Sequence, residues 1–130
     1  MKTVVAGIVI FNNEILIGKK ITKRNHFLSG GWHIPGGHVF ENEDLIASLI
    51  REFKEETNLE ISVIHKIVEK PIPENNVVVH WYLCKSESAN VVPGDDLSDL
   101  KFVNRKNVVK ECDIRATRFW PKEVMEYLME

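Results

Sequence analysis

The hydrophobic residues of this 130-residue chain fall into runs with strand-like spacing and one long run with helix-like spacing. Residues 3–11 are β-branched and nearly all apolar, which is typical of a central strand buried on both faces. Asn12 and Asn13 follow, and because Asn tolerates positive φ they predict a tight turn. A second strand is expected over residues 14–18, so the first predicted unit is a β-hairpin.

The spacing changes to that of an amphipathic helix after residue 42. Apolar residues then recur at i, i+3 and i+4, which predicts one buried stripe: Leu45, Ile46, Leu49, Ile50 and Phe53. Asn42 is the expected N-cap. The helix is expected to end near Thr57, with Asn58 as a left-handed C-terminal cap.

The remaining segments alternate between strands, polar loops and short helices. Strands are expected over residues 59–70, 76–84 and 100–103, and helices over 104–111 and 122–129. Residues 19–26 read as a basic loop and residues 85–97 as a polar loop. This order predicts one domain, residues 1–130, of α/β class (α+β type), with a mixed sheet between helices.

Composition excludes several classes of protein. The net charge of −2 argues against a protein that coats nucleic acid or an anionic membrane, because both tasks need a basic excess. The apolar run near residue 4 is too short to span a membrane. Cys84 and Cys112 form no C-x-x-C pair, so we expect neither a disulfide framework nor a zinc site, and a cytoplasmic location fits.

Three carboxylates lie close together on the predicted helix. Glu52, Glu55 and Glu56 are three and four residues apart, which places them along one face beside the apolar stripe. Mg²⁺ and Mn²⁺ prefer carboxylate and carbonyl oxygens, and the preceding Gly36 and Gly37 allow a sharp turn and a close approach of the backbone to a ligand. The alternative is a solvated acidic face, on which this spacing is common.

The stretch from residue 37 to residue 59 resembles the signature of the Nudix hydrolases (MutT-like), G-x5-E-x7-R-E-U-x-E-E-x-G-U, in which U is a bulky apolar residue. In this chain it reads GHVFENEDLIASLIREFKEETNL. Every fixed position matches except the last glycine, which is Asn58. Asn is the residue next most able to adopt the left-handed conformation, so the departure does not affect the acids. The preceding W-x-x-P-G-G of residues 32–37 is also similar to the family's usual lead-in.

The resemblance implies a role for each matching position. It implies a Nudix-like α/β/α sandwich and a pyrophosphohydrolase that depends on Mg²⁺, with Mn²⁺ as a substitute. Glu52, Glu55 and Glu56 would be metal ligands, with the Gly36 carbonyl beside them. Arg51 and Glu43 would tie the helix to its loop. A further acid would come from Asp95 or Asp96, of which Asp96 is the candidate ligand; the alternative is a plain Pro-Gly-Asp turn. Glu52, Glu55 and the loop aspartates are all candidates for the general base.

The implied substrate is a nucleoside diphosphate linked to another group. It could be a nucleoside triphosphate, a nucleotide sugar, ADP-ribose or a dinucleoside polyphosphate. Candidate substrate-binding residues are Lys23 and Arg24, whose loop could instead simply be solvated, together with Gly37 and His38. The expected partner is this small nucleotide, with no nucleic acid and no membrane, and a homodimer is compatible with the sequence. The alternative function is a non-catalytic nucleotide-binding or regulatory module with the same fold.

Overall fold

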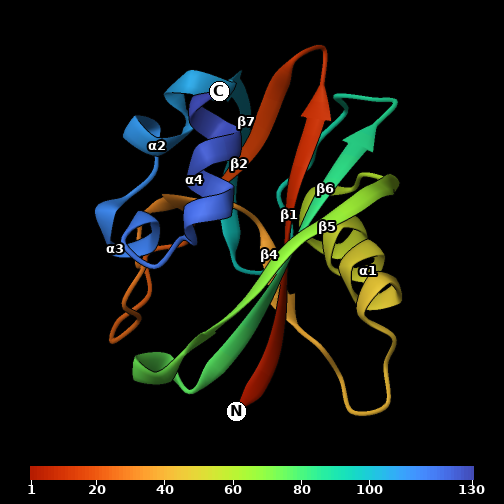
Figure 1. The fold of residues 1–130 in the computed structure, drawn as a ribbon. Helices are drawn as coiled ribbons and strands as arrows, with labels where there is room; N and C mark the ends of the chain where they lie inside the picture. The colour runs from red at the N-terminus through yellow and green to blue at the C-terminus, as the bar shows by residue number, and fades with distance from the viewer.

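The computed structural model describes residues 1–130 as a seven-stranded mixed sheet with helices on both faces (Figure 1). The strands are β1 (Lys2–Phe11), β2 (Glu14–Lys20), β3 (Trp32–His33), β4 (Gly36–His38), β5 (Ile61–Ile72), β6 (Val77–Ser86) and β7 (Leu97–Asn104). The helices are α1 (Leu45–Thr57), α2 (Val108–Glu111), α3 (Ile114–Thr117) and α4 (Lys122–Met129), with single 3₁₀ turns at Pro73–Asn75 and Arg105–Asn107. None of these helices is long and apolar enough to cross a membrane.

The sheet is organised around β1, whose two ends pair with different strands. The main order is β3-β2-β1-β6-β5, and β6 runs parallel to β1 while the other pairs are antiparallel. Ile10 and Phe11 pair with β2, whereas residues 4–6 pair with β4. β7 pairs with the far side of β2. The short strand β4 is therefore held against the middle of the sheet, directly before α1.

Side-chain alternation along β1 divides the core into two layers. Ala6 and Ile8 face the layer that contains α2 and α4, whereas Val5 and Val9 face the layer that contains α1. All four side chains are buried, which confirms β1 as a strand covered on both faces. Figure 1 shows the same arrangement, with α1 on one side of the sheet and the C-terminal helices on the other. The predicted α/β/α sandwich is thus confirmed.

Two sequence-based details of the helix are wrong. The N-cap of α1 is Asp44, whose side chain accepts a hydrogen bond from the Ala47 N–H at 3.0 Å; Asn42 lies earlier in a turn with φ of 64°. Ile46 is 41% exposed, because it lies at the edge of the apolar stripe. The C-terminal cap at Asn58, with φ of 66°, is confirmed.

Element boundaries elsewhere follow the expected order with shifts of a few residues. The β1–β2 turn at Asn12 and Asn13 is confirmed by φ values of 49° and 65°. β2 continues to Lys20, two residues further than expected. Pro71 lies inside the edge strand β5, where proline is tolerated because only alternate N–H groups of an edge strand bond to a neighbouring strand. The sequence did not predict α3, which is only four residues long.

Candidate active site

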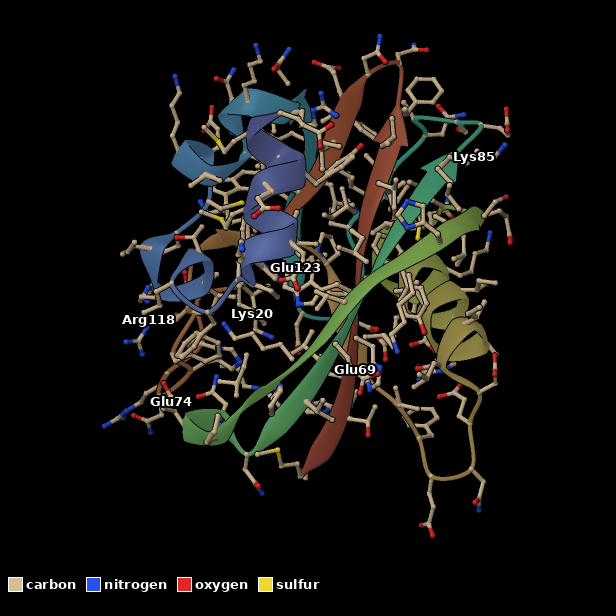
Figure 2. The ribbon with its side chains drawn as sticks, in the orientation of Figure 1. Lys20, Glu69, Glu74, Lys85, Arg118 and Glu123 are labelled. Carbon is tan, nitrogen blue, oxygen red and sulfur yellow. The ribbon has the colours of Figure 1, made fainter.

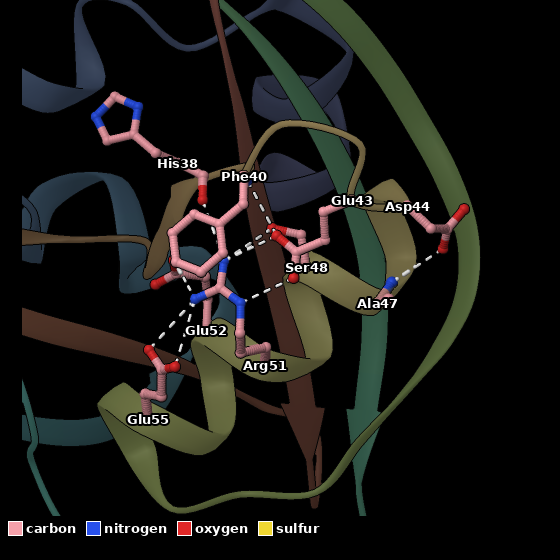
Figure 3. A network of polar contacts seen from close by, with 9 residues as sticks. All are labelled: His38, Phe40, Glu43, Asp44, Ala47, Ser48, Arg51, Glu52 and Glu55. Carbon is pink, nitrogen blue, oxygen red and sulfur yellow. Dashed lines mark hydrogen bonds and ion pairs between the residues drawn. The ribbon is translucent and has the colours of Figure 1, made fainter.

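An ion-pair network fixes the loop before α1 to the helix itself (Figure 3). Arg51 donates from Nε and Nη2 to the two carboxylate oxygens of Glu43, at 2.9 and 3.0 Å. Glu43 also accepts from the Phe40 N–H at 3.0 Å. These contacts, with Arg51 the largest cause, lower the pKa of Glu43 to about 2. Glu43 and Arg51 therefore form a bidentate pair between the loop and the helix.

The same guanidinium reaches the acids on the next turns of α1. Arg51 Nη1 lies 3.1 Å from Glu52 Oε1 and 3.3 Å from Glu55 Oε2. Glu52 is buried and Glu55 is exposed. Arg51 thus balances part of the acidic charge in this conformation. No group of three or more His, Cys, Asp or Glu side chains is here gathered closely enough to hold one ion.

Glu56 provides the test of whether the site suits a cation. Its Oε1 atom is buried and has no hydrogen-bond partner. Burial raises the pKa of Glu56 to about 8, and the negative charges of Glu52 and Asp95 add to the shift. Burial also raises the pKa of Glu52. A buried carboxyl without a donor is costly to a fold, and a divalent ion is a partner that would stabilise the charged form of both acids. The donor set consists of oxygens, as Mg²⁺ and Mn²⁺ require.

Gly36 and Gly37 form a strand and not the sharp turn that we expected. They lie in β4 and pair with Ala6 and Val5 of β1, and neither has positive φ. Glycine is needed because the space for a side chain is already filled. A Cβ on Gly36 would lie 2.1 Å from the Val5 carbonyl oxygen, and one on Gly37 would lie 2.3 Å from the carboxyl carbon of Glu52. The backbone at Gly37 therefore runs directly against an acid of α1.

A loop between β6 and β7 completes the wall of the site. The Val92 and Gly94 N–H groups donate to the carbonyls of Thr57 and Glu56, at 3.1 and 2.9 Å. These bonds hold the loop on the C-terminal turn of α1. They bring Asp95 and Asp96 to the same cavity as Glu52 and Glu56, a hollow of about 680 Å³.

Lys20 also lines this cavity, and the sequence reading did not select it. Its ammonium lies 2.8 Å from Asp96 Oδ2, and its side chain is only 10% exposed. In Figure 2 Lys20 lies within the outline of the molecule, whereas Lys85 lies at its edge. Strand alternation could have found it, because Leu16, Gly18 and Lys20 share one face of β2. That signal was lost when the predicted strand stopped at Gly18.

Only two of the four predicted substrate-binding residues line the cavity that contains Glu52 and Glu56, which we call the acidic cavity. His38 and Gly37 line the acidic cavity, whereas Lys23 and Arg24 are exposed and do not line it. His33 lines it as well, and burial, helped by the nearby Lys20 cation, lowers the pKa of His33 to about 4. His33 is therefore neutral at pH 7. The structure brings together Glu52 and Glu56 of α1, both β4 glycines, His38 and both loop aspartates. The third acid of α1, Glu55, is exposed and does not line this cavity.

The chain is similar to known proteins in both sequence and structure. Residues 1–128 match the family described as NUDIX domain. An ADP-ribose pyrophosphatase from Methanocaldococcus jannaschii is 27% identical over 110 residues, covering 82% of this chain and 63% of that protein. An 8-oxo-dGTP diphosphatase from Buchnera aphidicola is 43% identical over 58 residues, covering 45% of this chain and 43% of that protein. The chain thus spans less than two thirds of either relative.

Solved structures give the same fold. A NUDIX hydrolase from Nitrosomonas europaea superposes with a TM-score of 0.71 at 23% identity, covering 79% of this chain and 57% of that one. A bifunctional NMN adenylyltransferase/ADP ribose pyrophosphatase from Francisella tularensis, complexed with AMP and a Mn ion, superposes with a TM-score of 0.67 at 26% identity. The superposition covers 85% of this chain and 37% of that protein.

Proposed function

The chain belongs to the NUDIX domain family, and from that premise we propose that it is a hydrolase that depends on a divalent metal ion and cleaves the pyrophosphate of a nucleoside diphosphate derivative. The whole of residues 1–130 would form this one catalytic domain. The ion would be Mg²⁺, with Mn²⁺ as a substitute, and the partner a small nucleotide.

The observation that carries the proposal is the buried Glu56 carboxyl without a hydrogen-bond partner, with Glu52 and Asp95 close enough to raise its pKa. We propose Glu52, Glu55 and Glu56 as metal ligands, with the Gly36 carbonyl beside them. Asp96 is already paired with Lys20, whereas Asp95 has the stronger effect on Glu56. Asp95 is therefore the better placed of the two for the remaining ligand, and Asp96 would orient Lys20.

The chain's own groups would bind and orient the substrate. Bound divalent ions would neutralise the pyrophosphate, activate a water molecule and stabilise the leaving phosphate. Arg51, tied to Glu43, would hold the Glu52 and Glu55 carboxylates at fixed positions. The Lys20 ammonium, which lines the same cavity, would face the phosphate oxygens. Glu52, Glu55 and the loop aspartates Asp95 and Asp96 remain the candidates for the general base that accepts the proton of the attacking water.

The test is turnover of a panel of pyrophosphate compounds with Mg²⁺ or Mn²⁺. The panel would contain nucleoside triphosphates, nucleotide sugars, ADP-ribose, an 8-oxo-purine nucleotide and dinucleoside polyphosphates. We expect hydrolysis of at least one compound and its loss in Glu56→Gln. Glu60→Gln is the matched control, because Glu60 is 76% exposed and pairs only with Lys54. Tight nucleotide binding without any turnover would instead support the binding or regulatory module.

Location and assembly are part of the same proposal. Cys84 and Cys112 are both free and buried, which fits a reducing cytoplasm. A homodimer is compatible with the fold, and gel filtration with light scattering would measure the molecular mass in solution.

A further inference from the structure

An exposed aromatic ring lies in the loop between β4 and α1. Phe40 is 59% exposed, although aromatic rings contribute most to stability when they are buried. It occupies one of the five positions between Gly37 and Glu43 that the signature leaves open. A role for this ring is therefore a property of this chain and does not follow from the signature.

The ring lies against the guanidinium of Arg51 (Figure 3). Arg51 Cζ lies over the Phe40 ring, 3.8 Å from its centroid, which is well within the distance at which an aromatic face attracts a cation. The Phe40 N–H also donates to Glu43 Oε1, the oxygen that accepts from Arg51 Nη2. The ring and the backbone of Phe40 thus both act on the ion pair between Arg51 and Glu43.

Hydrogen-bond acceptors already occupy the whole edge of this guanidinium. Nε and Nη2 donate to Glu43, Nη2 also donates to the His38 carbonyl at 3.3 Å, and Nη1 donates to two acids of α1. Only the two flat faces of the group remain, and Phe40 covers one of them. The ring excludes water from that face, and attraction between opposite charges is stronger where water is excluded.

The direction of Nη1 matters because it is the part of Arg51 that reaches the proposed metal ligands. Nη1 donates to Glu52 Oε1 at 3.1 Å, and this is the one hydrogen bond that the Glu52 side chain makes. Nη1 also lies 3.3 Å from Glu55 Oε2. A carboxylate held through one oxygen presents the other to an ion, and partners that orient ligating carboxylates in this way contribute to metal affinity.

We propose that Phe40 is a positioning residue of the metal site, whose ring holds the Arg51 guanidinium so that Nη1 keeps Glu52 and Glu55 where a divalent ion binds them. This inference rests on the proposed function in taking these two acids as ligands. Phe40 acts only through Arg51, because its ring offers no oxygen to the ion. Arg51 keeps its charge in every variant of Phe40, so a change in ion affinity reports the position of that charge.

Binding of Mn²⁺ to the chain without substrate tests the inference apart from turnover. Electron paramagnetic resonance measures the free ion, well below the melting temperature of each variant. Phe40→Leu keeps an apolar side chain but removes the aromatic face. We expect it to weaken Mn²⁺ binding about 2- to 5-fold, the affinity ratio that corresponds to one exposed cation–π contact.

A second variant separates the ring from the mere bulk of the side chain. Phe40→Trp retains an aromatic face, and Trp is the best aromatic partner of a cation. It should therefore bind Mn²⁺ at least as tightly as the parent chain. A residue that served only to stabilise the loop would not show this dependence on the aromatic face.

Phe27→Leu is the matched control, because it makes the same change at a second exposed ring. Phe27 is 51% exposed, does not contact Arg51 and does not line the acidic cavity. This variant should bind Mn²⁺ like the parent chain. Glu56→Gln should lose most of the binding, which shows that the measured ion is held by the proposed site.

The possible outcomes separate this inference from the proposed function. Unchanged or tighter Mn²⁺ binding in Phe40→Leu, or equal weakening in Phe40→Leu and Phe40→Trp, would overturn the inference and leave the proposed function standing. Equal weakening in Phe27→Leu would overturn it as well, because the effect would not depend on contact with Arg51. Absence of Mn²⁺ binding in the parent chain would refute the proposed metal site, and the inference with it.

Discussion

At the scale of single residues, Gly36 and Gly37 show that neighbours can need glycine for different reasons. A Cβ on Gly36 would meet the backbone oxygen of Val5, which is fixed by the sheet, whereas the atoms nearest to one on Gly37 would belong to the Glu52 side chain. We therefore expect Gly36→Ala to lower the free energy of unfolding by about 2 kcal/mol or more, as overpacking does. Gly37→Ala should keep most of the stability and lose hydrolysis, because it displaces an acid.

Thermal unfolding and turnover, measured on both variants, separate the two effects. Each variant is the control for the other, since both add the same methyl group to β4. The assignment of Glu52 to the metal site fails if Gly37→Ala hydrolyses its substrate at the parent rate.

The burial of the two thiols predicts that they react slowly at pH 8. Burial raises the pKa of Cys84 and that of Cys112 to about 12. Because only the thiolate reacts, and a raised pKa keeps the thiol neutral, the reactive fraction at pH 8 is about a thousandfold below that of a thiol with pKa 9. We expect an aromatic disulfide reagent to label neither residue quickly in the folded protein at pH 8, and to label both once denaturant is added. Free glutathione is the reference, and fast labelling of the native chain would contradict the burial of that thiol.

The site residues differ in how far the sequence could identify them. Glu52, Glu55 and Glu56 were proposed from their spacing, and Glu43 and Arg51 from resemblance to a signature. Lys20 was missed because its significance depends on Asp96, which lies 76 positions further along the chain. Contact between residues so far apart depends on the β2–β7 pairing, which local patterns do not specify.

At the scale of elements, α1 shows which parts of a helix are determined locally. Its apolar stripe predicted the helix, and Leu49 and Phe53 are fully buried. Its start was not determined locally, since Asn42 and Asp44 are both good N-caps. The choice depends on Glu43, whose bonds to Arg51 and Phe40 hold the preceding turn in place.

The C-terminal cap of α1 tests whether Asn58 serves the purpose of the glycine found in the signature. Asn58 has φ of 66° and donates its backbone N–H to the Lys54 carbonyl. Asn58→Gly removes the strain of a Cβ in the left-handed region, and we expect a gain of up to about 1 kcal/mol in the free energy of unfolding. Asn58→Ala should lose stability, because Ala adopts this conformation less readily than Asn. Urea unfolding of the parent chain, Asn58→Gly and Asn58→Ala measures the order of their stabilities. If Asn58→Ala were more stable than the parent chain, Asn58 would not act as the cap.

At the scale of the whole molecule, the site depends on contacts between segments that no local pattern joins. β4 reaches the middle of the sheet because β1 pairs with it at residues 4–6 and with β2 only at its far end. The sequence predicted a mixed sheet between helices, but it did not predict this strand order. It therefore placed the glycines in a turn, whereas the structure places Gly36 against the Val5 backbone and Gly37 against Glu52.

The loop that carries Asp95 and Asp96 is attached to α1 by backbone contacts, which makes its position testable. A Cβ on Gly94 would lie 2.2 Å from the Glu55 carbonyl oxygen, an atom that the helix holds in place. Gly94→Ala must therefore shift the loop outward, which would weaken the bonds from Val92 and Gly94 to the end of the helix. Asp95 would then move away from Glu56. The ion pair between Asp96 and Lys20 would either move with the loop or break. We expect a loss of about 1–3 kcal/mol in the free energy of unfolding.

Gly94→Ala should lower turnover much more than its modest loss of stability can explain. The variant stays almost fully folded, whereas the part of the cavity formed by Asp95 and Asp96 is displaced. Turnover at saturating Mg²⁺, measured well below the melting temperature, separates the two effects. Glu87→Ala is the matched control, since Glu87 is exposed in the same loop and makes no ion pair; it should keep both stability and rate. Full activity in Gly94→Ala would show that the site needs only α1 and β4, and that the loop aspartates are a turn and not part of the metal site.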